Sequence, residues 1–346
     1  MQKEDQLEIL EFIRQNPLRS SGQIHDAIHT GRAYATTKRL LAELLAADYI
    51  TKQGGGRATK YVISPAYALQ HPIDPEAYFK DEIDARQIKQ RFNLELITGT
   101  LAKAGLFTGN ELQHLAQLQD EFTNNVSHLS KTIYDKEFER LAIDLSWKSS
   151  QIEGNTYSLL ETERLLKERE MAIGKPKDDA VMLLNHKEAI EFVVNHPDYV
   201  VPLSVSRIED IHSILVKDLG INRNIRQRRV GISGTNYTPP DNEYQIKEAL
   251  FDMCVLINGK DNIFEKALLA LILLSYIQPF EDGNKRTARI VSNAILIANS
   301  YCPISFRTAD ATEYKKAMLI FYEQNNISAF KKLFINQFEF AVKTYF

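Results

Sequence analysis

Hydrophobic residues recur with a helical period through most of this chain. From residue 80 onward almost every segment has this period, and Gly and Pro lie mainly between segments. The segment from Glu265 to Ile277 is apolar at most positions, which is typical of a helix buried on all sides. Pro279 cannot continue that helix, and Asp282-Gly283-Asn284 predicts a turn into a second helix from Lys285 to about Ala298.

Residues 1–64 form a pattern of their own. Apolar residues at helical spacing predict a first helix before Pro17, Ser20-Ser21 predicts the cap of a second, and a third is expected from about Ala33 to Ala47. Two short strands around the turn Gly54-Gly55-Gly56 follow. Three helices and a glycine-tipped hairpin resemble a winged helix-turn-helix domain.

Basic side chains outnumber acidic ones on the expected third helix and the hairpin. Residues 32–60 contain two acidic residues, Glu43 and Asp48. They contain six basic residues: Arg32, Lys38, Arg39, Lys52, Arg57 and Lys60. Such an excess is suited to DNA phosphates, so DNA is one candidate partner of residues 32–60. The alternative is a protein-interaction or dimerisation domain of the same shape whose basic side chains are solvated.

Prolines at positions 65, 72 and 75 predict a linker over residues 65–89, followed by a helical domain over residues 90–346. The expected fold class is therefore mainly α, with a small α+β domain in front.

Residues 227–240 are the exception within the helical domain. Val230, Ile232 and Tyr237 alternate around Gly234-Thr235-Asn236, which predicts a β-hairpin that either is structural or pairs with another chain.

Composition limits the classes of protein that fit. The apolar share of 44% and the charged share of 25% are those of a globular protein, and no apolar run of membrane-spanning length occurs. The first residues lack an apolar signal-peptide core, so we expect a cytoplasmic protein. Cys254 and Cys302 are expected to be buried free thiols. The oligomeric state is left open by the sequence.

Residues 278–289 combine three cations with a predicted helix N-terminus. Lys285, Arg286 and Arg289 lie in the first turns of that helix, where free backbone amides also favour an anion. Asp282 adds one carboxylate, and Mg²⁺ is usually held by one or two carboxylates together with phosphate oxygens. The alternative is an ordinary capped helix start with solvated arginines.

The same stretch resembles the signature of the Fic family, H-P-F-x-D-G-N-G-R-x-x-R. The matching positions are Pro279, Phe280, Asp282, Gly283, Asn284, Arg286 and Arg289. The resemblance implies a helical Fic fold whose enzymes transfer AMP from ATP to a hydroxyl of a target protein. It further implies that Asp282 binds Mg²⁺ and that the nucleotide lies against Gly283, Asn284, Lys285, Arg286 and Arg289.

In the Fic family the segment at 227–240 is a flap that clamps an extended part of the target protein by strand addition. Carried over to this chain, the flap residues that would face the target are Val230, Gly231, Ile232 and Ser233.

Two positions depart from the signature. Gln278 stands where the family has a His that removes the proton of the attacking hydroxyl, and a glutamine side chain has no accessible basic form. Because losing a general base costs about 10²- to 10⁴-fold in rate, we expect impaired transfer. His186 and His212 are the candidates for a substitute base. Lys285 stands where the family has a second Gly.

Residues 149–155 resemble the inhibitory motif [S/T]-x-x-x-E-[G/N] of the Fic family, with Ser149, Glu153 and Gly154 at the matching positions. In relatives with this motif the Glu pairs with the second signature Arg and so blocks the pose in which the γ-phosphate of ATP would be bound. The resemblance therefore implies that Glu153 pairs with Arg289. The alternative is an exposed Glu near a helix end.

The sequence leaves two other functions open. A catalytically silent body could sense nucleotide while the N-terminal domain binds DNA. Alternatively, the run N-K-R-T-A at 284–288 also occurs in the Doc toxins, relatives of the Fic family that are thought to move the γ-phosphate, so phosphoryl transfer is a third hypothesis.

Overall fold

The computed structural model describes residues 2–28 and 33–346. The chain divides into two compact units, an N-terminal unit that ends at Pro72 and a helical body from Ile73 to Phe346. Each unit has its own core.

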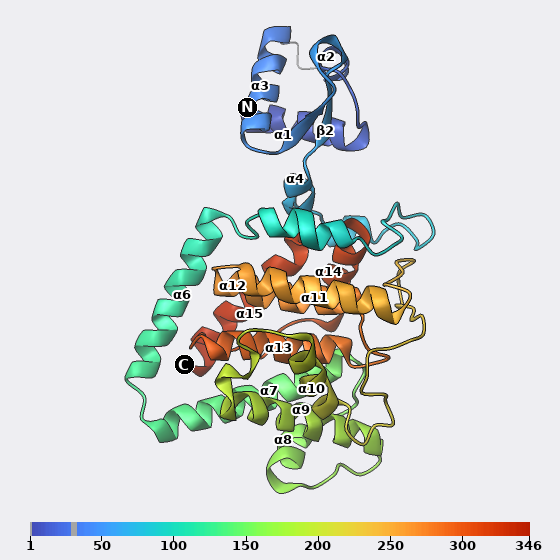
Figure 1. Cartoon of the computed structure of the whole chain (residues 1–346). Coiled ribbons are helices and arrows are strands. Elements are labelled where there is room, and N and C mark those ends of the chain that lie inside the picture. The colour runs from blue at the N-terminus through green and yellow to red at the C-terminus, as the bar shows by residue number, and fades with distance from the viewer. Residues whose placement is uncertain (1, 29–32) are drawn as a thin grey trace. The chain divides into compact units, whose positions relative to one another are not determined.

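The N-terminal unit contains a cluster of helices and one hairpin (Figure 1). Its elements are α1 (Gln2–Gln15), α2 (Ser21–Ala27), α3 (Tyr34–Ala46), β1 (Ile50–Gln53), β2 (Lys60–Ile63) and α4 (Pro65–Gln70). Strands β1 and β2 are antiparallel, with Ile50 opposite Ile63. A small core of Ile, Leu and aromatic side chains from the helices and the hairpin holds the unit together. The predicted three helices and hairpin are confirmed as elements, and the winged helix-turn-helix assignment stays a prediction.

The cap of α2 shows how the sequence sets a helix start. The Ser20 hydroxyl accepts a hydrogen bond from the backbone of Gln23, and the Gln23 side chain accepts one from the backbone of Ser20. This reciprocal capping box satisfies two backbone donors that the first turn of a helix leaves unpaired. The predicted cap is therefore present.

The basic residues predicted to face DNA are only partly described. Arg39 pairs with Glu43 one turn along α3, and Lys38 lies 4.9 Å from the centre of the Tyr34 ring. Both interactions are exposed and leave the cations accessible to solvent. Arg32 and the side chain of Arg57 lie outside the described residues. DNA binding through residues 32–60 stays a prediction.

The helical body confirms the predicted mainly α fold class. Its main helices are α5 (Pro75–Tyr78), α6 (Gly109–Ser127), α7 (Lys131–Ile152), α8 (Leu159–Glu168), α9 (Lys177–Asn195), α10 (Val205–Leu215), α11 (Glu243–Gly259), α12 (Ile263–Ile277), α13 (Asn284–Ala298), α14 (Ala311–Gln324) and α15 (Ser328–Tyr345). A π-helical stretch at Leu96–Leu101 and a short 3₁₀ turn at Pro197–Val200 complete it.

Helix α12 lies at the centre of this body. Every residue from Ala267 to Ile277 is buried, as the uninterrupted apolar run predicts. Helix α13 packs against α12 after a short loop, and α10, α11 and α14 cover the pair (Figure 1). The loop between α12 and α13 is therefore fixed at both ends by buried helices.

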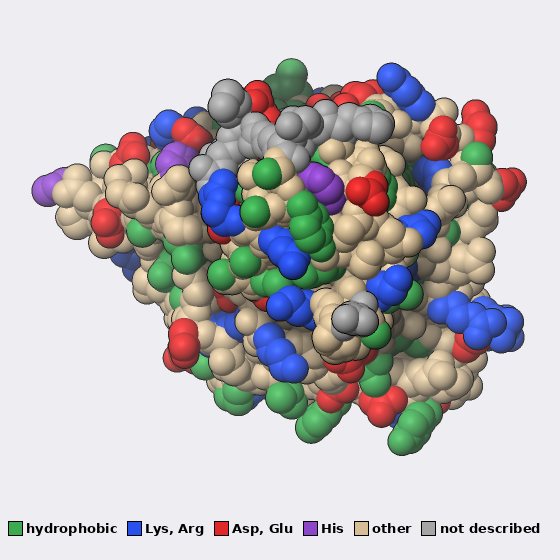
Figure 2. Space-filling model, turned by 90° about the horizontal axis from the view of Figure 1, so that it is seen from above, with side chains coloured by type: hydrophobic (Ala, Val, Ile, Leu, Met, Phe, Trp, Pro, Cys, Tyr) green, Lys and Arg blue, Asp and Glu red, His purple; other side chains and the backbone are tan. Residues whose placement is uncertain are grey.

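The surface carries both signs of charge. Figure 2 shows Lys and Arg side chains interspersed with Asp and Glu on the face that it presents. The formal net charge of -3 is small for 346 residues, so any attraction to a polyanion must be local. Within the described residues no helix is long and apolar enough to cross a membrane. Cys254 and Cys302 are buried free thiols, as predicted.

The prediction that residues 227–240 form a two-stranded β-hairpin is wrong. This segment is an extended loop with a turn at Ser233-Gly234, and its two arms form no ladder with each other. One arm pairs elsewhere: Thr238 donates its N–H to Gln90 and accepts from the N–H of Phe92. The alternation of Val230, Ile232 and Tyr237 correctly indicates extended backbone, but it cannot identify the pairing partner.

We expect the buried position of α12 to determine the stability of the helical body. Leu271→Ala removes a fully buried side chain and leaves a cavity, which costs about 2–5 kcal/mol. Leu160→Ala removes the same atoms from an exposed position of α8 and should change stability by less than about 0.5 kcal/mol. Urea unfolding followed by circular dichroism measures both. Equal shifts for the two variants would contradict the central role of α12.

Candidate active site

The loop between α12 and α13 is shaped by two residues in the left-handed region. Gln278 ends α12 with φ of 51°, and Gly283 precedes α13 with φ of 79°. A Cβ at position 283 would also lie 3.3 Å from the side chain of Val216, so glycine fits both the backbone angle and the space. Phe280 is fully buried between these ends, and its ring stacks on His212 with centroids 3.6 Å apart.

Asn284 braces this loop from within. Its side-chain oxygen accepts from the backbone N–H of Phe280 at 2.8 Å. Its amide group donates to the carbonyl of Phe280 at 2.8 Å and to the side-chain oxygen of Gln278 at 3.0 Å. The Asn284 side chain therefore fixes the conformation of the loop by hydrogen bonds. Its contact with a nucleotide stays a prediction.

Gln278 is held at both ends of its amide. Its Nε2 donates to the carbonyl of Ser275 at 2.7 Å, and its Oε1 accepts from Asn284. The side chain thus belongs to the hydrogen-bond network of the loop.

Arg286 is a buried cation with incomplete pairing. Its side chain is 1% exposed, and one terminal nitrogen donates to Asp282 at 3.0 Å. Its Nε and the other terminal nitrogen have no hydrogen-bond partner among the described residues. Burial lowers the pKa of Arg286, which shows that this charge is poorly solvated. Because buried donors are normally paired, these two nitrogens are donors that an anion at the loop could use.

Asp282 is an accessible carboxylate of the loop, as is its neighbour Glu281. The Asp282 side chain is 64% exposed, in contrast to the buried Arg286 with which it pairs. No cluster of three or more His, Cys, Asp or Glu side chains suited to a metal occurs within residues 2–28 and 33–346. Asp282 alone fits the sparse protein coordination of Mg²⁺, which keeps waters and takes phosphate oxygens as ligands.

Arg289 is completely buried and is held by the end of α7. Its Nε donates to the Ser149 hydroxyl at 2.7 Å, and a terminal nitrogen donates to the Ser149 carbonyl at 2.8 Å and to Glu153 at 2.9 Å. Burial opposes the charge of Arg289, but Tyr314 and Glu153 outweigh that effect and raise its pKa. The pairing of Glu153 with Arg289 that the resemblance implies is present.

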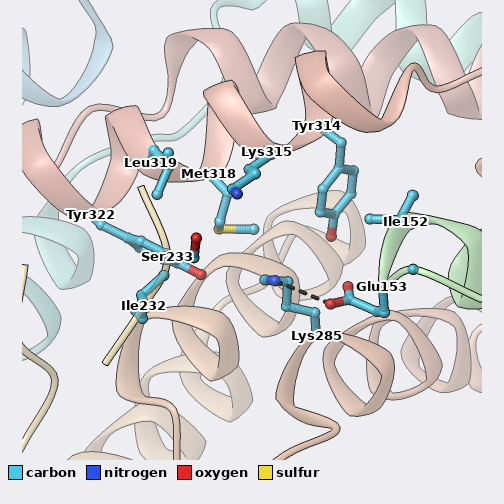
Figure 3. Close-up of a pocket in the computed structure, with 11 residues that line it drawn as sticks. Ile152, Glu153, Ile232, Ser233, Lys285, Tyr314, Lys315, Met318, Leu319 and Tyr322 are labelled. Carbon is cyan, nitrogen blue, oxygen red and sulfur yellow. Dashed lines mark hydrogen bonds and ion pairs between the residues drawn. The ribbon is translucent and has the colours of Figure 1, made fainter. Parts of the chain in front are cut away.

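Glu153 also pairs with Lys285. The ammonium group lies 3.1 Å from the second carboxylate oxygen of Glu153, as the dashed line in Figure 3 marks. Burial opposes ionisation of Glu153, but Arg289 and Lys285 outweigh it and lower its pKa, so the side chain is a carboxylate at neutral pH. Glu153 stands at the C-terminal end of α7, where the helix dipole disfavours a negative charge. The two cations therefore compensate an otherwise unfavourable position.

His186 and His212, the two candidates for a substitute base, are buried and contact backbone carbonyls or a serine hydroxyl. Both ring nitrogens of His212 face backbone carbonyls, of Asp282 at 3.0 Å and of Arg223 at 3.2 Å, and burial lowers its pKa to about 4. His186 is fully buried, and its Nε2 lies 2.7 Å from the Ser149 hydroxyl. Burial lowers the pKa of His186 well below its ordinary value. Both are buried side chains that contact neighbouring site elements.

A cavity of about 330 Å³ opens beside the Glu153–Lys285 pair. Figure 3 shows Lys285 and Glu153 facing each other below side chains of α14, with Ile232 and Ser233 of the flap segment on another side. The residues that line it are Ile152, Glu153, Gly154, Ile232, Ser233, Lys285, Tyr314, Lys315, Met318, Leu319 and Tyr322. Of the four predicted flap residues, Ile232 and Ser233 line this cavity, and Val230 and Gly231 do not.

Arg226 is a site residue that the sequence reasoning missed. It is 1% exposed and donates from its side chain to the carbonyls of Gln278 at 2.6 Å, Arg228 at 2.7 Å and Pro240 at 2.8 Å. It thereby connects the loop between α12 and α13 to both ends of the flap segment, residues 227–240. Its neighbours in sequence include other arginines, so no local pattern distinguishes the buried one.

Comparisons with known proteins agree with this geometry. Residues 202–296 match the Fic/DOC family. A relative from Nematostella vectensis, "Protein adenylyltransferase Fic", is 25% identical over 295 residues, which cover 79% of this chain and 68% of the relative. "Protein adenylyltransferase fic-1" of Caenorhabditis elegans is 25% identical over 213 residues, 59% of this chain and 40% of that protein. The second match thus spans less than half of the relative.

The solved structure of Fic-1 (residues 134–508) from C. elegans is similar in fold. It has a TM-score of 0.58 and 21% sequence identity, and the match covers 68% of this chain and 70% of that chain. The family match contains the loop at 278–289 and most of the helices that hold it. This chain therefore contains a Fic/DOC family domain at residues 202–296.

Proposed function

We propose that this chain is a protein adenylyltransferase, which transfers AMP from ATP to a hydroxyl group of a target protein. The observation that carries the proposal is the buried, unpaired donor pair on Arg286 at the start of α13. A helix N-terminus with three cations binds a polyphosphate, and the side chains fit ATP better than a single small anion. The names of the relatives support the same reaction.

Each residue of the loop has a task in this proposal. Arg286 binds the β-phosphate through its free nitrogens, Arg289 binds the γ-phosphate, and the backbone amides beside Gly283 bind oxygens of the phosphate chain. Asp282 holds Mg²⁺, which when bound neutralises charge that develops on the phosphates during transfer. The exposed position of Asp282 leaves room for that role.

Glu153 keeps the enzyme in an inhibited state. Its two carboxylate oxygens take one donor of Arg289 and the ammonium of Lys285, which are the groups that a γ-phosphate would use. A carboxylate and a phosphate compete for the same cations, so productive ATP binding requires Glu153 to leave. Ser149 supports the inhibited state because its hydroxyl and carbonyl hold Arg289 in place.

Gln278 limits the rate of transfer. The amide is hydrogen-bonded at both ends and has no basic form near neutral pH, so it cannot accept the proton of an attacking hydroxyl. His212 and His186 do not replace it because both are buried on carbonyl or hydroxyl partners. In this proposal the chain binds nucleotide productively only when Glu153 leaves, and it then transfers AMP poorly.

The target protein binds along residues 230–233. This stretch, which ends in the turn at Ser233-Gly234, pairs with no strand among the described residues, so its backbone groups are available to an added strand. Within it, Ile232 and Ser233 reach the cavity, which brings a bound segment close to the phosphates.

A nucleotide-sensing DNA-binding regulator is the second candidate. The engaged amide of Gln278 favours it because a sensor needs nucleotide binding without a base, and the N-terminal unit supplies helices and a basic hairpin. Phosphoryl transfer, suggested by Lys285, is distinguished from AMP transfer by the mass of the adduct, because only AMP transfer adds the adenosine group.

Gln278→His should restore transfer. We expect incorporation of label from α-³²P-ATP with Mg²⁺ into the protein to rise by about 10²-fold or more, because a general base typically contributes 10²- to 10⁴-fold. Incorporation is counted after denaturing electrophoresis. A second change, Asp282→Asn, should abolish the gain. Glu153→Gly removes the inhibitory carboxylate. If neither Glu153→Gly alone nor Glu153→Gly together with Gln278→His takes up label, the adenylyltransferase proposal is contradicted.

Glu153→Gly should release the inhibited state. In the Gln278→His background we expect self-labelling to rise about tenfold or more, since each 1.4 kcal/mol of competing ion-pair free energy is tenfold in affinity. The matched control is Glu170→Gly, which removes an exposed carboxylate of the loop after α8 and should leave labelling unchanged. Equal labelling with and without Glu153 would show that it does not guard the site.

The second candidate predicts binding of duplex DNA by the N-terminal unit. If the hairpin contacts phosphates, Lys52→Gln weakens binding in a gel shift for all sequences and lowers the slope of log affinity against log salt by about one. Lys167→Gln, an exposed cation of α8, serves as the control. Failure to shift any duplex at low salt would remove this candidate.

A further inference from the structure

The segment Tyr78–Asn93, which we call the strap, lies against the flap segment within the helical body. Two of its side chains contact the flap turn and the residues just after it: Arg86 donates to the carbonyl of Gly234 in the turn, and Asp84 accepts from Asn236 at 2.9 Å. Further along, the backbone of the strap pairs with Thr238 through Gln90 and Phe92. The strap therefore supplies hydrogen bonds to the turn and to the second arm of the flap, residues 234–238.

Arg86 is the central contact of the strap. One terminal nitrogen donates both to the carbonyl of Gly234 at 2.7 Å and to Glu323 of α14 at 2.9 Å. The Arg86 side chain is 7% exposed and Glu323 is fully buried. The guanidinium lies 5.0 Å from the centre of the Phe79 ring, which covers it further. A planar cation in such surroundings has few alternative positions, so its hydrogen bond to Gly234 is directional.

Glu323 is itself held in place. Its second oxygen accepts from the Tyr78 hydroxyl at 2.7 Å, so the strap contacts this carboxylate from two directions. Burial and this hydrogen bond raise the pKa of Tyr78, which keeps the phenol protonated as a donor. The carboxylate thus fixes Arg86 relative to α14, whose side chains also line the cavity.

The turn that Arg86 holds forms part of the cavity wall. Gly234 directly follows Ile232 and Ser233, which line the cavity. A Cβ at Gly234, whose φ is 93°, would lie 3.3 Å from Leu319 of α14, so the turn sits closely on that helix. A loop with no ladder of its own depends on such anchors to keep one conformation.

We propose that Arg86 is a positioning residue for the flap, which sets the place of Ile232 and Ser233 at the cavity without touching the reacting groups. The proposal rests on the proposed function for its catalytic consequence. Its structural part, that Arg86 orders the flap turn, rests on the contacts of Arg86 with Gly234 and Glu323 alone.

Hydrogen–deuterium exchange followed by mass spectrometry tests the structural part on the full chain. Arg86→Gln should speed exchange in peptides that cover residues 229–239 severalfold and leave peptides of α12 and α13 unchanged. Arg164→Gln, which removes an exposed, ion-paired arginine from α8, is the matched control and should change neither region. Unchanged exchange at 229–239 in Arg86→Gln would overturn the proposal.

A second variant addresses folding. Arg86→Gln leaves Glu323 as a buried charge, and such unpaired charges destabilise strongly. The double variant Arg86→Met/Glu323→Gln removes both charges and lets the new amide accept from Tyr78. We expect the same faster exchange at 229–239 in this variant, and protection equal to that of the parent chain would overturn the proposal.

Self-labelling with α-³²P-ATP in the Gln278→His background tests the catalytic part. Arg86→Gln should lower labelling about tenfold, and Arg86→Lys, which keeps the charge, should recover part of it. Labelling that stays unchanged while exchange at 229–239 rises would show that flap order does not serve transfer and would overturn the positioning role. If Gln278→His itself takes up no label, the adenylyltransferase proposal fails, and the exchange result alone decides whether Arg86 orders the flap.

Discussion

The burial of two guanidinium groups at the start of α13 is the constraint on which the site depends. Arg286 and Arg289 are at most 1% exposed, although the cost of removing a cation from water is large unless a partner compensates it. Arg289 has such a partner in Glu153, and Arg286 has only the exposed Asp282. Among the described residues, one nitrogen of Arg289 and two nitrogens of Arg286 have no hydrogen-bond partner, so the body leaves both cations partly unsatisfied, Arg286 more than Arg289. In the proposed function, a ligand with several negative oxygens pairs with both cations, and Glu153 competes with it for Arg289.

The two arginines stay buried because packed helices and hydrogen bonds hold the loop in front of them in place. The cations stand on α13, which packs on the completely buried α12, and Asn284, His212 and Arg226 hold the intervening loop by hydrogen bonds to its backbone. A less rigid loop would turn its amides and cations towards water and lose the preorganisation that makes them useful to a phosphate. The flap is the opposite case, since its arms share no ladder and depend on contacts from other segments.

The sequence predicted those features that local chemistry determines. The apolar run of α12, the capping serine of α2 and the turn at Asp282-Gly283 each follow from residues close together in the chain. The pairing of Glu153 with Arg289 followed from a resemblance, because no local rule connects residues so far apart. The flap pairing was wrong and Arg226 and Arg86 were missed for a common physical reason. Whether an arginine is buried, or which strand an extended arm meets, depends on distant segments such as the strap.

The two restraints on activity in the proposed function differ in kind, and this difference bears on how such an enzyme would be regulated. The contact of Glu153 with Arg289 and Lys285 is a competition, so any event that moves the end of α7 changes its outcome reversibly. Gln278 restrains the chemical step itself, and no movement of α7 gives an amide a basic form. Release of Glu153 alone would therefore raise nucleotide affinity much more than transfer. In the proposed function, the ion pair therefore controls whether ATP binds productively, and the residue at position 278 controls how fast bound ATP gives up its AMP.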